Sequence, residues 1–216
     1  YSQKEGVDYD QCFSATLRAT SFRLLLAIAA WHSMELEQLD VTSAFTQAKL
    51  DDVDIWIEPA PGFEQYDKNG HSMVYKLKQA LYGTKQASRL WQQTLREWLI
   101  SVGFTSSLSD PCLFHRRRNG KILLVAIYVD DVVCAHSNQG EFDAFKHEFC
   151  TRFRASHLGK LHWFLGMSID RGDDNSVILG HQKYIEDLVD KFIPDFDSNS
   201  ILRDIPCTSE KFAQVG

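Results

Sequence analysis

A pair of adjacent aspartates inside an apolar stretch places the strongest constraint on how this chain folds. Asp130 and Asp131 separate the strongly apolar segment 121–129 from the apolar run 132–135. A buried carboxylate is costly unless it is paired or binds a metal ion, whereas aspartates in a tight turn remain solvated. The pattern therefore predicts two strands joined at the aspartates, and a plain Asp-Asp turn is the alternative to a functional pair.

A third carboxylate, together with the pair, indicates a possible metal site. Asp40 lies near the end of another predicted strand, which begins at Met34 and leads into a turn near Ala44. If the two strands are neighbours, the three carboxylates converge at one end of the sheet. Hard oxygen donors of this kind suit Mg²⁺, which takes its remaining ligands from water and substrate phosphates. Two such ions can activate a 3′-hydroxyl and stabilise a leaving pyrophosphate, as nucleotidyl transfer requires.

Hydrophobic periodicity supplies the other elements. The spacing predicts helices near 20–33, 86–102, 142–153 and 184–192. Thr20 or Ser21 is the predicted cap of the first. Predicted strands besides those above cover 53–57, 74–77, 112–116, 163–169 and 176–179. Helices alternate with local hairpins, which favours an α+β fold in which helices back an antiparallel sheet.

Composition excludes several classes of protein. The chain has 216 residues, 44% of them apolar, and a formal net charge of −6, as in ordinary globular proteins. No apolar run approaches the length of a membrane helix, and the five cysteines contain no C-x-x-C pair. We expect a reducing, intracellular setting, no membrane partner and no zinc site. Because the chain does not begin with Met, we also expect a fragment.

Charge is distributed unevenly along the chain. Residues 50–67 carry six acidic residues and no base, whereas residues 76–96 carry five basic residues and no acid. A second basic cluster comprises Arg116, Arg117, Arg118 and Lys121. Any polyanion would have to bind to such local basic surfaces, because the whole chain is acidic. Solvated faces are the alternative explanation for each run.

The sequence resembles the reverse transcriptase of Ty1/copia-type retrotransposons. Eight blocks match in order over nearly the whole chain, and together they are far more specific than any single block. The blocks cover residues 1–9, 21–27, 38–45, 58–63, 75–91, 128–131, 164–167 and 182–185. The resemblance implies a polymerase palm and fingers, N-terminally truncated because the family's upstream finger strands and downstream RNase H domain lie outside the chain. It divides residues 1–216 into palm and fingers with motifs A and B over about 1–100, palm with motif C and the primer-grip hairpin over 101–180, and the start of the thumb or connection region over 181–216.

The same resemblance implies a role for individual residues. Asp40 matches the motif A carboxylate, and Asp130 and Asp131 match the motif C pair. Together they would be the catalytic residues and would hold Mg²⁺, with Mn²⁺ as a substitute. The backbone carbonyl of Val41 would add a ligand.

Other matched residues would contact nucleotide, template or primer. Phe45 stands at the bulky steric gate that favours deoxynucleotides, and Gln86 at the motif B glutamine that contacts nucleotide or template. Arg23 would face the triphosphate, with a surface helix position as the alternative. Lys85 and Arg89 would make phosphate contacts to the template. The primer grip would comprise Leu165, Gly166 and Met167.

The leading hypothesis is therefore an RNA-directed DNA polymerase that adds dNMP to a primer 3′-OH. Its partners would be an RNA template, a DNA primer, dNTPs and the RNase H and integrase portions of a Pol polyprotein. It would work in a cytoplasmic virus-like particle or in the nucleus. The alternatives are an inactive or incomplete relic that retains nucleic-acid binding, and another nucleotidyl transferase or cyclase with a palm-like core. Thr84, Ser88 and Ala15 depart from the family pattern, where Leu, Pro and Pro are usual.

Overall fold

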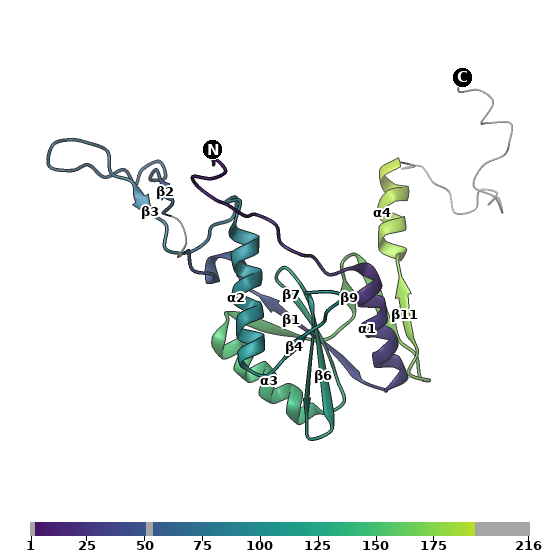
Figure 1. Ribbon diagram of the computed structural model, residues 1–216. Coiled ribbons are helices and arrows are strands. Elements are labelled where there is room, and N and C mark those ends of the chain that lie inside the picture. Colours follow the sequence, from purple (N-terminus) through teal and green to yellow (C-terminus); the bar gives the residue numbers. More distant parts are fainter. Residues whose placement is uncertain (1–2, 51–53, 193–216) are drawn as a thin grey trace. The chain divides into compact units, whose positions relative to one another are not determined.

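The computed structural model describes residues 3–50 and 54–192, which form a mixture of helices and antiparallel sheets (Figure 1). The described chain has four α-helices and one short 3₁₀ helix, η1: α1 Ala19–Trp31, η1 Ala44–Gln47, α2 Ala87–Ser101, α3 Gln139–Arg152 and α4 Gln182–Phe192. Its strands are β1 Glu35–Val41, β2 Trp56–Ile57, β3 Tyr75–Lys76, β4 Thr105–Ser106, β5 Leu113–Arg118, β6 Lys121–Tyr128, β7 Asp131–His136, β8 Ala155–Lys160, β9 Trp163–Phe164, β10 Met167–Arg171 and β11 Val177–Gly180. The predicted α+β class with helices backing an antiparallel sheet is confirmed.

The chain divides into two compact units. The first comprises residues 1–162 and 171–177, and the second comprises residues 163–170 and 178–216. None of the described helices is both long enough and apolar enough to cross a membrane.

A six-stranded sheet forms the centre of the first unit, with the strand order β4-β5-β6-β7-β1-β8. Its described strand pairs are antiparallel. Although β1 and β7 are about ninety residues apart in sequence, they are hydrogen-bonded neighbours, and Asp40 pairs with Asp131. The sheet thus makes neighbours of β1 and β7, which the sequence analysis could only assume.

Helices cover the two faces of this sheet (Figure 1). Leu39, Val132 and Cys134 lie on the face that packs with α2 and α3 in one buried core. Because side chains alternate along a strand, Val133 and Ala135 lie on the opposite face, where α1 contacts β6 and β7. Asp40 and Asp131 share this second face.

The helices begin and end for identifiable reasons. Asn138 caps α3, because its side chain accepts a hydrogen bond of 3.1 Å from the backbone N–H of Glu141. The predicted cap of α1 was wrong: Thr20 and Ser21 lie inside the helix, and its N-cap residue is Arg18, with no side-chain cap. Asp110 instead accepts a hydrogen bond from the Arg18 backbone N–H at 3.0 Å, so a distant loop fixes the helix start.

Three other expectations need correction. Residues 163–169 do not form one strand, because Leu165 and Gly166 form a two-residue turn between β9 and β10. Strand β8 was not predicted, since its sequence is polar and contains a glycine. Arg116 does not belong to a basic surface, because it is buried, with only 3% of its surface exposed.

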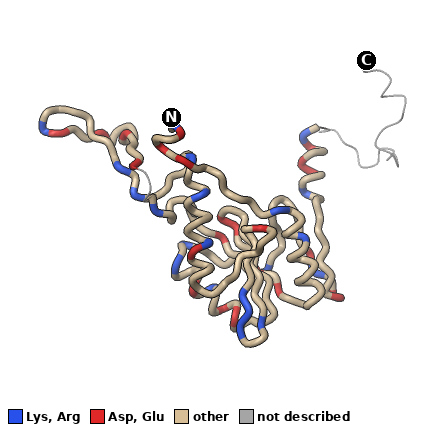
Figure 2. The backbone as a smooth tube through the Cα atoms, in the orientation of Figure 1, with Lys and Arg blue, Asp and Glu red and all other residues tan. Residues whose placement is uncertain are grey.

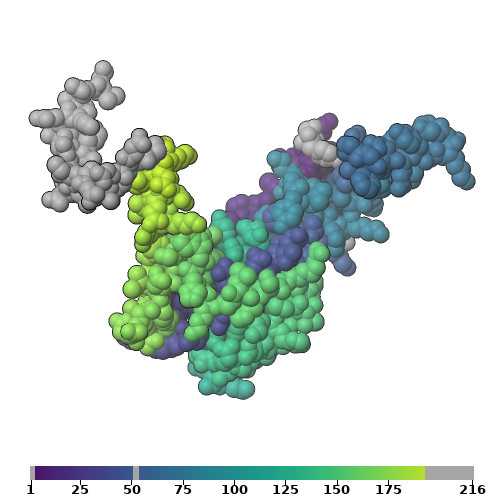
Figure 3. Space-filling view, turned by 180° about the vertical axis from the view of Figure 1, so that it is seen from behind, coloured from purple at the N-terminus to yellow at the C-terminus, as the bar shows by residue number. Residues whose placement is uncertain are grey.

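The segment between η1 and α2 is mostly exposed. Strands β2 and β3 form a separate two-stranded sheet, and nearly all residues over 58–79 are exposed, as the blue segment in Figure 3 shows. Val53, which was predicted to begin the first of these strands, lies outside the described residues.

In the second unit, β9, β10 and β11 form a three-stranded sheet in the order β11-β10-β9. Helix α4 has no buried residue among its described side chains, and Tyr184, Ile185 and Phe192 are exposed. The predicted helix over 184–192 is confirmed.

Candidate active site

Three carboxylates meet where β1 ends and the β6–β7 hairpin turns. Asp40 is the penultimate residue of β1, Asp131 is the first residue of β7, and the two are paired across the strands. Asp130 lies in the intervening turn, and its backbone carbonyl accepts a hydrogen bond of 2.9 Å from the N–H of Val41. All three side chains are partly exposed, so they can reach solvent or a ligand. Figure 2 shows acidic residues at this end of the hairpin and basic residues at the opposite end, where β5 turns into β6.

Burial and charge repulsion both disfavour the charged form of Asp131. Burial raises the pKa of the Asp131 carboxyl, and the neighbouring charges of Asp130 and Asp40 raise it further. Gln38 opposes this shift, because its Nε2 donates a hydrogen bond of 3.0 Å to Oδ1 of Asp131. A cation placed among the three carboxylates would relieve the repulsion.

The donor set can be compared with what different ions require. Among the described residues, no group of three or more His, Cys, Asp or Glu side chains, the three aspartates included, forms a ready-made cage that could hold a metal ion. Mg²⁺ does not need such a cage, because one or two carboxylates, water and substrate phosphates usually complete its shell. Asp40 and Asp131 on adjacent strands, with Asp130 beside them, fit that requirement.

The turn that carries Asp130 is held by helix α2. Val129 has a positive φ of 58°, which is unusual for a β-branched residue. Its carbonyl accepts a hydrogen bond of 2.6 Å from Nε1 of Trp91, a buried residue of α2. Neither Trp91 nor Gln38 was singled out from the sequence. Gln38 could have been found, because it lies two residues before Asp40 and so shares its face of the strand.

Gln86 lies at the start of α2 beneath the N-terminal segment. It is only 3% exposed. Its Nε2 donates to the carbonyl of Asp8 at 3.2 Å, and its Oε1 accepts from Nε2 of Gln3 at 3.1 Å. Both ends of its amide are therefore already engaged within the chain.

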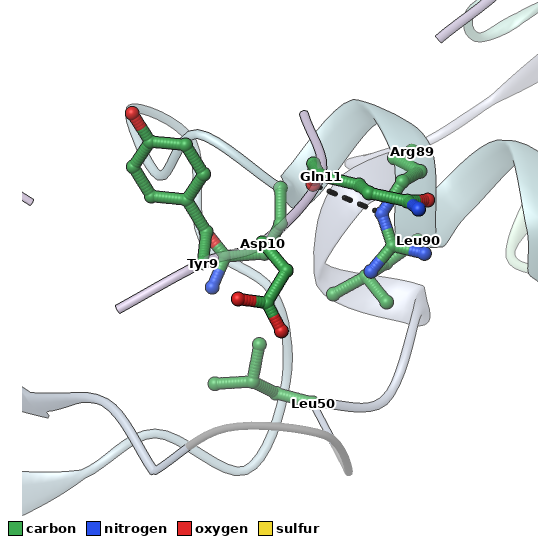
Figure 4. A pocket seen from close by; sticks show the side chains of 7 residues that line it. Tyr9, Asp10, Gln11, Leu50, Arg89 and Leu90 are labelled. Atoms are coloured by element: carbon green, nitrogen blue, oxygen red, sulfur yellow. Dashed lines mark hydrogen bonds between the residues drawn. The ribbon is translucent and has the colours of Figure 1, made fainter. Parts of the chain in front are cut away.

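Lys85 and Arg89 flank the same segment. The Lys85 side chain is exposed, while its backbone N–H donates to Oε1 of Gln3 at 2.7 Å. Nε of Arg89 donates to the carbonyl of Gln11 at 3.0 Å (Figure 4). These contacts join the N-terminal segment to the two predicted template residues, of which Lys85 precedes α2 and Arg89 lies in its first turn.

A pocket of about 240 Å³ opens between the N-terminal segment and α2 (Figure 4). It is lined by Tyr9, Asp10, Gln11, Leu50, Gln86, Arg89 and Leu90. The pocket carries one carboxylate, from Asp10, and one guanidinium, from Arg89. It therefore presents both signs of charge rather than a purely basic wall.

Phe45 lies in η1, five residues after Asp40. It is half-buried and packs against the main core, and its ring lies tilted by 32° against that of Tyr82, with 4.5 Å between the centroids. Phe45 is thus partly in the core and partly exposed. Both the steric gate and the simple core aromatic remain compatible with this placement.

Arg23 lies on the exposed side of α1, and among the described residues it forms no ion pair with the three aspartates. In the second unit, Leu165 and Gly166 form the exposed tip of a hairpin, with φ of 49° and 78°, and Met167 begins β10. Positive φ at both residues of a two-residue loop is typical of a type I′ turn. The hairpin form expected of a primer grip is present, and its role stays a prediction.

Comparison with known proteins places the chain among transposon polyproteins. It is 36% identical over 189 residues to the retrovirus-related Pol polyprotein from transposon RE1 of Arabidopsis thaliana, covering 88% of this chain and 13% of that protein. It is 34% identical over 194 residues to the corresponding polyprotein from transposon TNT 1-94 of Nicotiana tabacum, covering 89% and 14%. A putative transposon Ty5-1 protein of Saccharomyces cerevisiae is 29% identical over 147 residues, covering 68% and 47%.

The chain thus spans only about one seventh of the plant polyproteins that it matches. The sequence pattern of the family described as reverse transcriptase (RNA-dependent DNA polymerase) matches residues 1–201, which include all three carboxylates of the site. The chain therefore belongs to the reverse transcriptase family.

Proposed function

We propose that this chain is the palm and part of the fingers of an RNA-directed DNA polymerase that adds dNMP to a primer 3′-OH. The observation that carries the proposal is the pairing of Asp40 with Asp131 across β1 and β7, with Asp130 in the adjoining turn. Family membership supports the same reaction class.

Asp40, Asp130 and Asp131 would hold divalent cations, and Mg²⁺ fits their oxygen donors. When bound, the cations would lower the pKa of the primer hydroxyl and neutralise charge on the transferred phosphate. The chain's own contribution is to position the three carboxylates and to oppose the rise in the pKa of Asp131. Gln38 serves this purpose, because its hydrogen bond favours the charged form of Asp131.

The resemblance to the family supports the remaining proposed contacts. Phe45, on the turn after β1, would press against the sugar of the incoming nucleotide. Lys85 and Arg89 at the start of α2 would bind template phosphates, which positions the strand without reading its sequence. Gln86 would support Lys85 and Arg89 through the N-terminal segment, since both ends of its side-chain amide form hydrogen bonds with that segment.

Extension of a DNA primer on an RNA template, with Mg²⁺ or Mn²⁺, tests the proposal. Asp130→Asn should lower the rate by about 100-fold or more, because a group that stabilises charge in the transition state is lost. Asp143→Asn is the matched control, since Asp143 lies on α3, which packs on the other face of the sheet. Thermal unfolding of each preparation confirms that the variants fold.

The possible results separate the alternatives. Metal-dependent extension that Asp130→Asn abolishes and Asp143→Asn preserves supports the polymerase. Equal extension by the two variants overturns the assignment of the site. If the wild-type chain extends no primer with either metal, alone or within a longer Pol protein, the inactive relic takes the place of the polymerase.

A further inference from the structure

The turn that carries Asp130 has a conformation that its sequence disfavours. Tyr128 pairs with Asp131, so Val129 and Asp130 form a two-residue hairpin loop. Val129 has a positive φ and Asp130 does not. A positive φ at the first loop residue alone is typical of a type II′ turn, where glycine is preferred. A β-branched valine in this region is strained, so other contacts must hold it there.

Two hydrogen bonds hold the consecutive carbonyls of this loop. The Asp130 carbonyl accepts from the N–H of Val41, at the end of the strand that carries Asp40. The Val129 carbonyl accepts from Nε1 of Trp91 at 2.6 Å. The first bond extends the pairing of β1 with β7, whereas the second reaches the loop from a helix.

Trp91 is itself rigidly placed. It is 1% exposed, and its ring packs edge-on against Phe153 at 5.3 Å between centroids. The indole N–H is only a donor, and a buried donor requires an acceptor. Its position on α2 therefore fixes where the Val129 carbonyl must lie.

We infer that Trp91 is a positioning residue, which holds Val129 in the left-handed region and so sets Asp130 and Asp131 beside Asp40. The inference extends the proposed polymerase function, on which its kinetic consequence rests. Its structural part, the holding of the loop, does not depend on that function.

Packing alone is the competing explanation, and the chain offers a matched control for it. Trp98 lies two turns later on α2, and its ring packs edge-on against the same Phe153 at 5.2 Å. Within the described residues, Trp98 makes no hydrogen bond to the loop. Trp91→Phe and Trp98→Phe therefore make the same substitution in one aromatic cluster, although Trp98 is only partly buried, and only the first removes a bond to the loop.

The experiment has a structural arm and a kinetic arm. Amide hydrogen exchange at Val41 reports on the loop directly, because its N–H is bonded to Asp130. Trp91→Phe should speed this exchange by about tenfold or more relative to Trp98→Phe, since local opening becomes easier. In primer extension, Trp91→Phe should lower kcat by about 10- to 100-fold with KM for dNTP little changed, because the carboxylates are displaced.

A second substitution tests the cause. Val129→Gly removes the strain at the positive φ, because glycine adopts that region freely. Added to Trp91→Phe, it should restore much of the lost protection at Val41 and part of the lost kcat. Val129→Gly alone provides the baseline.

Faster exchange and lower kcat in Trp91→Phe alone, with recovery in the double variant, support the inference. Equal effects in the two tryptophan variants, or no recovery, show that Trp91 only fills the core and overturn it. If the wild-type chain has no extension activity, the proposed function fails, and the exchange arm still decides whether Trp91 holds the loop.

Discussion

At the scale of single residues, the site places a carboxylate where its charge is unfavourable. Burial raises the pKa of Asp131 above its ordinary value of 3.8, and the charges of Asp130 and Asp40 add to this. The folded state therefore binds a proton at Asp131 more readily than the unfolded state does. Stability from this group is fully present at low pH and is lost as pH rises through the folded pKa.

Asp131→Asn should therefore stabilise the fold at neutral pH while abolishing extension. An amide has no charge to desolvate, and it can still accept the hydrogen bond from Gln38. We expect a higher midpoint of urea unfolding at pH 7, with the difference from wild type shrinking as pH falls through the acid range. Urea titrations at several pH values measure this, and a lower midpoint at pH 7 would contradict it.

Asp130 and Asp131 could be predicted from the sequence as a turn or a metal-binding pair, because a charge inside an apolar stretch is costly unless it is solvated or paired. Their convergence with Asp40 could not be derived, since the pairing of β1 with β7 joins segments about ninety residues apart. The burial of Gln86 was equally hidden. It depends on Gln3 and Asp8, which only the folded chain brings to α2.

At the scale of elements, two arginines from β5 stabilise the end of helix α2. Nη1 of Arg116 and Nη2 of Arg118 both donate to the carbonyl of Val102, at 3.2 and 3.0 Å. Positive charge at a helix C-terminus is favourable. Arg116 is buried over the Phe104 ring at 4.7 Å, whereas Arg118 is exposed.

The two arginines should differ sharply in their contribution to stability. Arg116→Ala should lower the free energy of unfolding by about 2 kcal/mol or more, because it removes buried packing as well as a bond. Arg118→Ala should cost less than about 1 kcal/mol, since its partner remains bonded and the site is exposed.

A third variant separates packing from charge. Nε and Nη2 of Arg116 have no hydrogen-bond partner among the described residues, and burial lowers the pKa of this guanidinium. Its Nη2 and Nη1 also lie 3.7 and 3.8 Å from carboxylate oxygens of Glu141 and Glu148. Arg116→Met keeps the stem but removes the charge and both ion pairs, so it should recover only the part of the loss that comes from packing. Urea unfolding at one pH compares the three variants, and equal losses in both alanine variants would contradict the argument.

Elements with a regular apolar face could be predicted from the sequence, whereas exposed elements could not. Helices α2 and α3 carry regular apolar faces, and their predicted ranges are confirmed to within a few residues. Strand β8 has no such face, because it lies at the edge of the sheet and most of its side chains are exposed. The start of α1 depends on Asp110, ninety-two residues away from Arg18, so a local capping rule could not locate it.

At the scale of the whole molecule, the sequence predicted the fold class but not the division into two units. Residues 171–177 belong to the first unit although the strands on either side belong largely to the second. Hydrophobic periodicity describes single elements and contains no information about which unit a segment belongs to. The carboxylates all lie in the first unit, so binding of a cation should act on the stability of that unit.

A cation that binds the folded site should stabilise the fold in proportion to its occupancy. The gain reaches about 2.7 kcal/mol when the free ion is at 100 times its Kd, provided that the unfolded chain does not bind it. The midpoint of urea unfolding should therefore rise with Mn²⁺ and, at higher concentrations, with Mg²⁺. Excess EDTA should reverse the rise.

The shift should be lost when the site is neutralised. Asp40→Asn combined with Asp131→Asn removes the paired carboxylates of β1 and β7, whereas Asp143→Asn leaves them intact and should shift like wild type. Because this measurement needs neither template nor primer, it tests the carboxylate site apart from polymerisation. A shift that persists in the double variant would place the cation elsewhere. A shift that is lost in the double variant but kept in Asp143→Asn would connect the stability of the first unit to the pairing of Asp40 with Asp131.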